Sequence, residues 1–127
     1  MARLVKIRGE DAEVSVELGE GPTAEALWEA LPIESRASLW GEEIYFPISL
    51  SSEGEPGARE EVEVGAVAHW PPGDALCLFF GPTPASTGER PRAASPVTVV
   101  GKVVGGIEDC RRVSSGERLR VEAAGGQ

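Results

Sequence analysis

The chain has 127 residues, with 16 Gly and 10 Pro, and it carries 12 Lys and Arg against 21 Asp and Glu, a formal net charge of −9. So many glycines and prolines favour short elements joined by turns and argue against a helical bundle. A hydrophobic fraction of 41% excludes a disordered chain and suffices for one domain. With no basic patch to neutralise phosphates, we expect no nucleic-acid partner and no contact with an anionic membrane.

The cysteines and apolar runs indicate the cellular compartment of the protein. Cys77 and Cys110 form no CxxC pair, and each reads as a small buried hydrophobic residue. No N-terminal stretch resembles a signal peptide, and the longest apolar run, Ala75–Phe80, is too short to cross a membrane. We therefore expect a soluble cytoplasmic protein with free thiols and no cofactor.

In the first half of the chain, alternation of apolar and polar residues predicts an opening hairpin around the turn at Gly9–Asp11. A short helix follows, with Thr23 as its expected N-cap and Pro32 ending it. Strands then run from Ile33 to Leu50, broken at Gly41. In the last of them Ile44 and Phe46 face one way, whereas Glu43 and Tyr45 face the other.

The second half of the chain is also mostly strand. We expect, in order, a polar loop at 51–60, a strand at 62–70, a strand at 75–80 buried on both faces, a long loop at 81–96, a strand at 97–104, a short helix at 107–113, and a final strand at 119–123. Seven or eight strands with two short helices are most economically arranged as a closed β-barrel with a helix over each end.

Two segments carry a resemblance to a known family. Trp40–Phe46 (WGEEIYF) and Trp70–Pro84 (WPPGDALCLFFGPTP) resemble the small bacterial and archaeal cyclophilin-like family of uncharacterised proteins. A third segment, Val99–Ile107 (VVGKVVGGI), is similar to the Val-Phe-Gly-Lys-Val-x-x-Gly stretch of true cyclophilins. The resemblance covers nearly the whole chain. It implies one mainly β domain over residues 1–127, a closed eight-stranded cyclophilin-like barrel capped by two short helices.

The catalytic motif of true cyclophilins is missing from this sequence. Those enzymes use an arginine in a Phe-His-Arg motif after the first helix, where this chain has Leu39-Trp40-Gly41-Glu42-Glu43. The glutamine of their Ser-Gln-Phe-Phe stretch is replaced by Leu78. Arg36 lies nearby, but nothing in the motif maps it to the catalytic arginine. The resemblance thus implies the fold more strongly than it implies prolyl isomerisation.

Aromatic residues suggest where a ligand could bind. Trp40 and Trp70 each adjoin turn residues, so their side chains can lie at the rim of a barrel. We expect a shallow apolar groove with a few polar handles, formed by Trp40, Glu42, Tyr45, His69, Trp70 and Phe79. The aromatics could instead be core residues, and His69, the only histidine, could be structural or simply exposed. A metal site would need further His or Cys ligands at tight spacing, so we expect none.

Three functions remain open from sequence. The first is a peptide- or small-ligand-binding module without the usual prolyl-isomerase arginine. The alternative is a peptidyl-prolyl cis-trans isomerase with an atypical active site that uses Arg36 or His69 as donor. The third is an assembly partner that uses the aromatic rim as an interface. Catalysis by paired carboxylates at Glu42 and Glu43 is disfavoured because neighbouring strand residues point to opposite faces.

Overall fold

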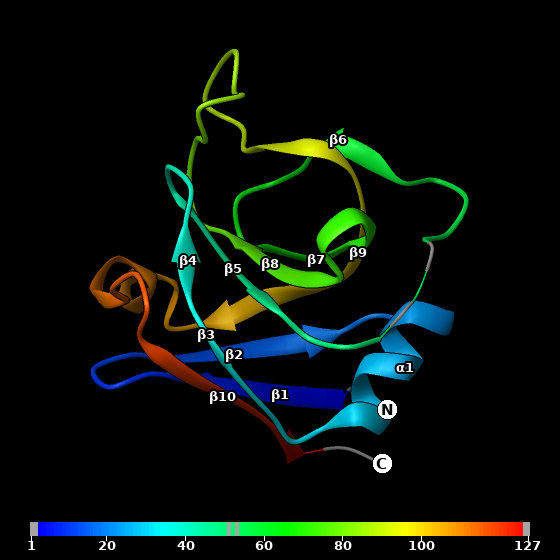
Figure 1. The fold of residues 1–127 in the computed structure, drawn as a ribbon, viewed down its shortest axis with the longest axis vertical. Coiled ribbons are helices and arrows are strands. Elements are labelled where there is room, and N and C mark those ends of the chain that lie inside the picture. The colour runs from blue at the N-terminus through cyan, green and yellow to red at the C-terminus, as the bar shows by residue number, and fades with distance from the viewer. Residues whose placement is uncertain (1–2, 51, 53, 126–127) are drawn as a thin grey trace.

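The computed structural model describes residues 3–50, 52 and 54–125, most of which form one strongly curled antiparallel sheet (Figure 1). Its strands are β1 (Arg3–Arg8), β2 (Glu13–Leu18), β3 (Ile33–Arg36), β4 (Ser38–Leu39), β5 (Glu43–Pro47), β6 (Arg59–Glu61), β7 (Ala66–Trp70), β8 (Ala75–Phe79), β9 (Arg92–Gly105) and β10 (Arg118–Gly125). Their order is β3-β10-β1-β2-β9-β7-β8-β5-β4, and β6 pairs with β9 beside this path. The fold is mainly β, as the sequence predicts.

The expected closed eight-stranded barrel is not what the strand pairing shows. The sheet has ten strands, and no pairing joins its two edges, β3 and β4. These edge strands are consecutive in the chain and are separated only by Ala37. Ala37 is hydrogen-bonded to the turn before β10: its N–H donates to the Glu117 carbonyl at 2.9 Å, and its carbonyl accepts from the Gly116 N–H at 2.7 Å. The backbone thus passes from one edge of the curled sheet to the other without a ladder between them.

Among the described residues, one α-helix and two 3-10 helices accompany the sheet. The α-helix α1 (Pro22–Ala30) and the 3-10 helix η2 (Ile107–Arg112) lie at opposite sides of the sheet in Figure 1, and η1 (Pro71–Gly73) links β7 to β8. Thr23 is not the N-cap. Gly21 occupies that position with φ 124°, and the Glu55 carboxylate accepts the Thr23 N–H at 2.8 Å. No helix in the described part of the chain is long and apolar enough to span a membrane.

Strand β8 is buried on both faces, as predicted, and it separates two apolar clusters. The main core holds Leu76 and Leu78 of β8 together with Ile44 and Phe46 of β5. The second cluster consists of Val62, Ala66, Ala68, Cys77, Phe79, Ala93 and Val97, with Tyr45 and Trp70 packed against it. Because alternate residues of a strand face opposite ways, Cys77 and Phe79 of β8 belong to the second cluster, whereas Leu76 and Leu78 belong to the main core.

The region between residues 51 and 105 departs most from the predictions. The strand expected at 62–70 is confined to β7, and Val64 before it is 54% exposed. The loop expected at 81–96 ends earlier, because β9 begins at Arg92 and its first part pairs with β6. Gly101 within β9 permits a close approach, since a Cβ there would lie 2.6 Å from the Glu17 carbonyl oxygen. The early part of β9 contributes Ala93 and Val97 to the second cluster and so covers it.

Candidate functional site

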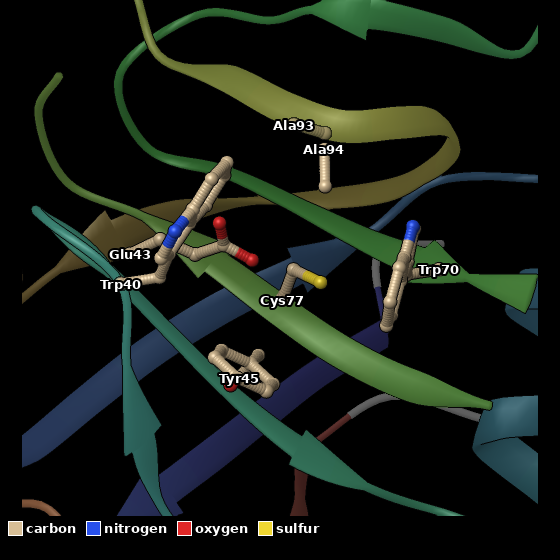
Figure 2. A pocket seen from close by; sticks show the side chains of 7 residues that line it. All are labelled: Trp40, Glu43, Tyr45, Trp70, Cys77, Ala93 and Ala94. Atoms are coloured by element: carbon tan, nitrogen blue, oxygen red, sulfur yellow. The ribbon is translucent and has the colours of Figure 1, made fainter. Parts of the chain in front are cut away.

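A cavity of about 250 Å³ lies at the margin of the second cluster (Figure 2). Its lining residues come from the β4–β5 turn and from strands β5, β7, β8 and β9: Trp40, Glu43, Tyr45, Trp70, Cys77, Ala93 and Ala94. The lining is mainly apolar and aromatic, with one carboxyl group among it. This combination is typical of small-ligand sites.

Strand alternation and register bring the cavity's central side chains together. Glu43 and Tyr45 are two positions apart on β5, so they share a face of the sheet. Tyr45 is paired with Cys77 of β8, which places the thiol on the same face. Ile44 between them is buried in the main core. The cavity is therefore built on the side of the β5–β8 pair that faces away from the main core.

The two tryptophans form opposing walls. In Figure 2 Trp40 and Trp70 are seen nearly edge-on at either side of the cavity, so their ring faces are turned toward the space between them. The indole N–H of Trp70 donates to the Ser95 hydroxyl at 2.7 Å, which fixes that ring. Trp40 is held by its backbone, which exchanges hydrogen bonds of 3.0 and 3.2 Å with Glu43. The Trp70 ring is thus held by a side-chain hydrogen bond, whereas the position of Trp40 is set through its backbone.

Glu43 supplies the cavity's charge chemistry. The residue is only 5% exposed, and its Oε1 atom has no hydrogen-bond partner among the described residues. Burial raises the pKa of the Glu43 carboxyl to about 7, an effect partly opposed by a hydrogen bond from the Cys77 thiol. Burial and the neighbouring Glu43 also raise the pKa of Cys77 far above its ordinary value, so this thiol is a poor nucleophile.

The structure brings three of the six expected groove residues together. Trp40, Tyr45 and Trp70 line the cavity. Glu42 does not, because its neighbour Glu43 points into the cavity and Glu42 points away, where its carboxylate pairs with the Arg111 guanidinium.

His69 and Phe79 are the other two expected groove residues outside the cavity lining. His69 is fully buried, and its Nε2 atom lies 2.8 Å from Oδ1 of Asp74, while its Nδ1 atom has no partner among the described residues. Phe79 is also fully buried, within the second cluster. Trp70 thus lines the cavity but its neighbour His69 does not, because the His69 side chain points to the other face of β7.

Four lining residues were missed by sequence reasoning: Glu43, Cys77, Ala93 and Ala94. Glu43 could have been found, because it shares strand parity with the predicted Tyr45. Cys77 requires the register between β5 and β8, which the sequence does not state. The alanines carry no chemical signal, and they lie in what sequence reasoning treated as loop.

Other candidate groups lie elsewhere. Arg36, the possible alternative donor, is exposed, and its guanidinium donates to the Gly116 carbonyl at 3.0 Å, away from the cavity lining. Within residues 3–50, 52 and 54–125, no three His, Cys, Asp or Glu side chains are grouped so as to hold a metal ion. The chemistry available in the cavity is therefore apolar and aromatic contact plus the Glu43 carboxyl.

Comparison with known proteins places these features in context. Residues 3–122 match a family model described as Cyclophilin-like. The structure is similar to the solution structure of a hypothetical protein from Archaeoglobus fulgidus, with a TM-score of 0.83 and 44% sequence identity over 97% of this chain and 95% of that one. No curated protein matches the sequence significantly.

Proposed function

The chain belongs to the cyclophilin-like family, and we propose that it is a ligand-binding module whose cavity holds part of a peptide or of a small molecule. The walls would be Trp40, Tyr45 and Trp70, with Glu43 as the polar anchor. A cavity of about 250 Å³ lies just below the usual range for drug-sized ligands, roughly 300–1,000 Å³. It suits one compact group of a ligand better than a whole ligand.

The observation that carries this proposal is the unpartnered oxygen of Glu43. Buried polar atoms in folded proteins nearly always have a hydrogen-bond partner, and one left without a partner costs stability. Oε1 of Glu43 has none among the described residues, although the side chain borders a cavity where a ligand could supply one. A purely structural role would give no reason to place a carboxyl there, since an apolar residue would pack at lower cost.

Filling the cavity from its exposed side tests the proposal. Ala94 is exposed and lines the cavity, so Ala94→Phe should occupy it without disturbing the core. Ala123→Phe, at an exposed position of β10, is the matched control. We expect a screen of fragments and short peptides by tryptophan fluorescence to yield ligands that bind the native protein and the control but not Ala94→Phe. Ligands that bind all three proteins equally would place the site elsewhere.

Prolyl isomerisation with an atypical donor is the second candidate function. It is favoured by the buried position of Glu43 in the cavity lining, since burial raises the pKa of this carboxyl to about 7 and so favours a neutral acid that can donate a hydrogen bond. Neither Arg36 nor His69 lines the cavity, so neither is placed to be that donor. We expect turnover of an Xaa-Pro peptide to be negligible. Robust turnover that is abolished by Glu43→Gln and unaffected by Arg36→Ala would establish the isomerase instead.

A further inference from the structure

The cavity walls have the composition of a cation-binding cage. Trp40 and Trp70 present ring faces to the space between them, and Tyr45 lies below that space in Figure 2. The face of an aromatic ring carries partial negative charge, so it attracts cations, and tryptophan does so most strongly. Three aromatic side chains around one small cavity therefore favour a positively charged occupant over a neutral one of the same shape.

The one acidic group in the cavity points to the same occupant. Glu43 is buried, one of its oxygens is unpartnered, and no Lys, Arg or His is among the cavity-lining residues. A buried carboxylate is costly unless a cation or hydrogen-bond donors compensate it. The nearby Glu42 shows the contrast, because it lies outside the cavity lining and is paired with Arg111. A ligand that carries a positive charge would supply the counter-ion that Glu43 lacks.

We propose, on the basis of the ligand-binding function above, that the cavity recognises an alkylated ammonium group, such as a trimethylammonium head, held between Trp40 and Trp70 with Glu43 as its counter-ion. The methyl groups explain the apolar remainder of the lining, since Ala93, Ala94 and Cys77 offer no further charge or strong acceptor. A primary ammonium is more strongly hydrated and would need several acceptors to replace its water. Alkylation spreads the charge over an apolar surface that matches this cavity.

The proposal also predicts how pH affects binding. Glu43 must be ionised to act as a counter-ion, and its pKa of about 7 means that ionisation takes place in the neutral range. The other titratable groups that face the cavity are Tyr45 on β5 and Cys77 on β8, while β9 contributes only alanines. Cys77 stays protonated at neutral pH, because its pKa is raised far above its ordinary value. Cation affinity should therefore rise several-fold between pH 6 and 8.

Choline and its uncharged isostere dimethylbutanol, in which carbon replaces the nitrogen, provide the sharpest test. We expect choline to bind the native protein about tenfold or more tightly than the isostere, measured by tryptophan fluorescence and calorimetry. Glu43→Gln should abolish most of this preference and its pH dependence. Trp40→Leu, which keeps an apolar wall, should weaken choline more than the isostere. Glu42→Gln, which removes the same charge outside the cavity, should change neither.

The outcomes separate this inference from the proposed function. Equal affinity for choline and dimethylbutanol would overturn the cation assignment while leaving an apolar binding site in place. Absence of choline binding would also overturn the cation assignment. If the fragment screen yielded no ligand either, the proposed binding function itself would be overturned. Ethanolamine, with a primary ammonium, should bind more weakly than choline. A short peptide with trimethyl-lysine tests the source of the group: tighter binding than free choline would assign it to a modified protein, and weaker binding to a small molecule.

Discussion

The two faces of strand β8 have very different surroundings. Leu76 and Leu78 point into the main core, which consists of buried apolar residues with further apolar residues packed against it. Cys77 and Phe79 point into the second cluster, which is covered by the early part of β9 only in part, so that a cavity remains beside Cys77. The cavity on this second face contains the Glu43 carboxyl group. One strand thus serves stability with one set of side chains and supports a binding site with the other.

The largest expected effect is on the main-core face. Leu78→Asp would bury an unpaired charge, and we expect it to lower the free energy of unfolding by about 4 kcal/mol or to prevent folding. Leu39→Asp is the matched control, because Leu39 is 41% exposed on β4 and should cost below about 1 kcal/mol. Denaturant titration measures both. A Leu78→Asp protein that is as stable as the control would refute the two-sided burial of β8.

An intermediate effect is expected at Glu43, on the second face. Below pH 4.5 the carboxyl is protonated in both folded and unfolded chains. As pH rises, the unfolded carboxyl ionises first, while the folded one stays protonated until about pH 7, so stability falls over this window. Relative to Glu43→Gln, native stability should decline by about 2 kcal/mol between pH 5 and 7.5. If the free energy of unfolding changed with pH in the same way for both proteins, the Glu43 carboxyl would not be buried in a protonated state.

The smallest effect is expected for Glu42, beside Glu43 in sequence but outside the cavity. Its ion pair with Arg111 is exposed to solvent, and such surface pairs contribute little to stability. Glu42→Gln should therefore change the denaturation midpoint only slightly at low salt and not at all at high salt. If Glu42→Gln lowered the free energy of unfolding as much as a core substitution, Glu42 would not lie exposed outside the cavity.

Much of the main core could be predicted because its pattern is local. Alternation along the first hairpin and the continuous apolar run of β8 depend only on neighbouring residues, and both are confirmed. The family resemblance, carried by WGEEIYF and the segment around β8, is confirmed as well. At Ala37 the backbone crosses from edge strand β3 to edge strand β4. This crossing was not predictable, since it depends on hydrogen bonds to Gly116 and Glu117, which lie far along the chain.

The site could be predicted only in part, because it depends on contacts between distant strands. Trp40 and Trp70 were identified from the turns beside them, and Tyr45 from its aromatic ring. Strand alternation shows that Glu42 and Glu43 cannot act as a pair. The same alternation puts Glu43 on the face of β5 that carries Tyr45. The extension of β9 to Arg92 was hidden by the prolines at 91 and 96, and with it the alanine wall of the cavity.

The central claim is that the second face of β5 and β8 holds a buried carboxyl with no counter-ion in the described part of the chain. Titration of the glutamate side chains tests it most directly. The carboxyl carbon of Glu43 can be followed by NMR from pH 3 to 9, assigned by its loss in Glu43→Gln. We predict a midpoint near pH 7 for Glu43, whereas Glu55 and Glu122, whose pKa values are lowered by hydrogen bonds from Thr23 and from Arg120 and Arg8, titrate first. If Glu43 titrated over the same pH range as Glu55 and Glu122, its carboxyl would not be buried as claimed.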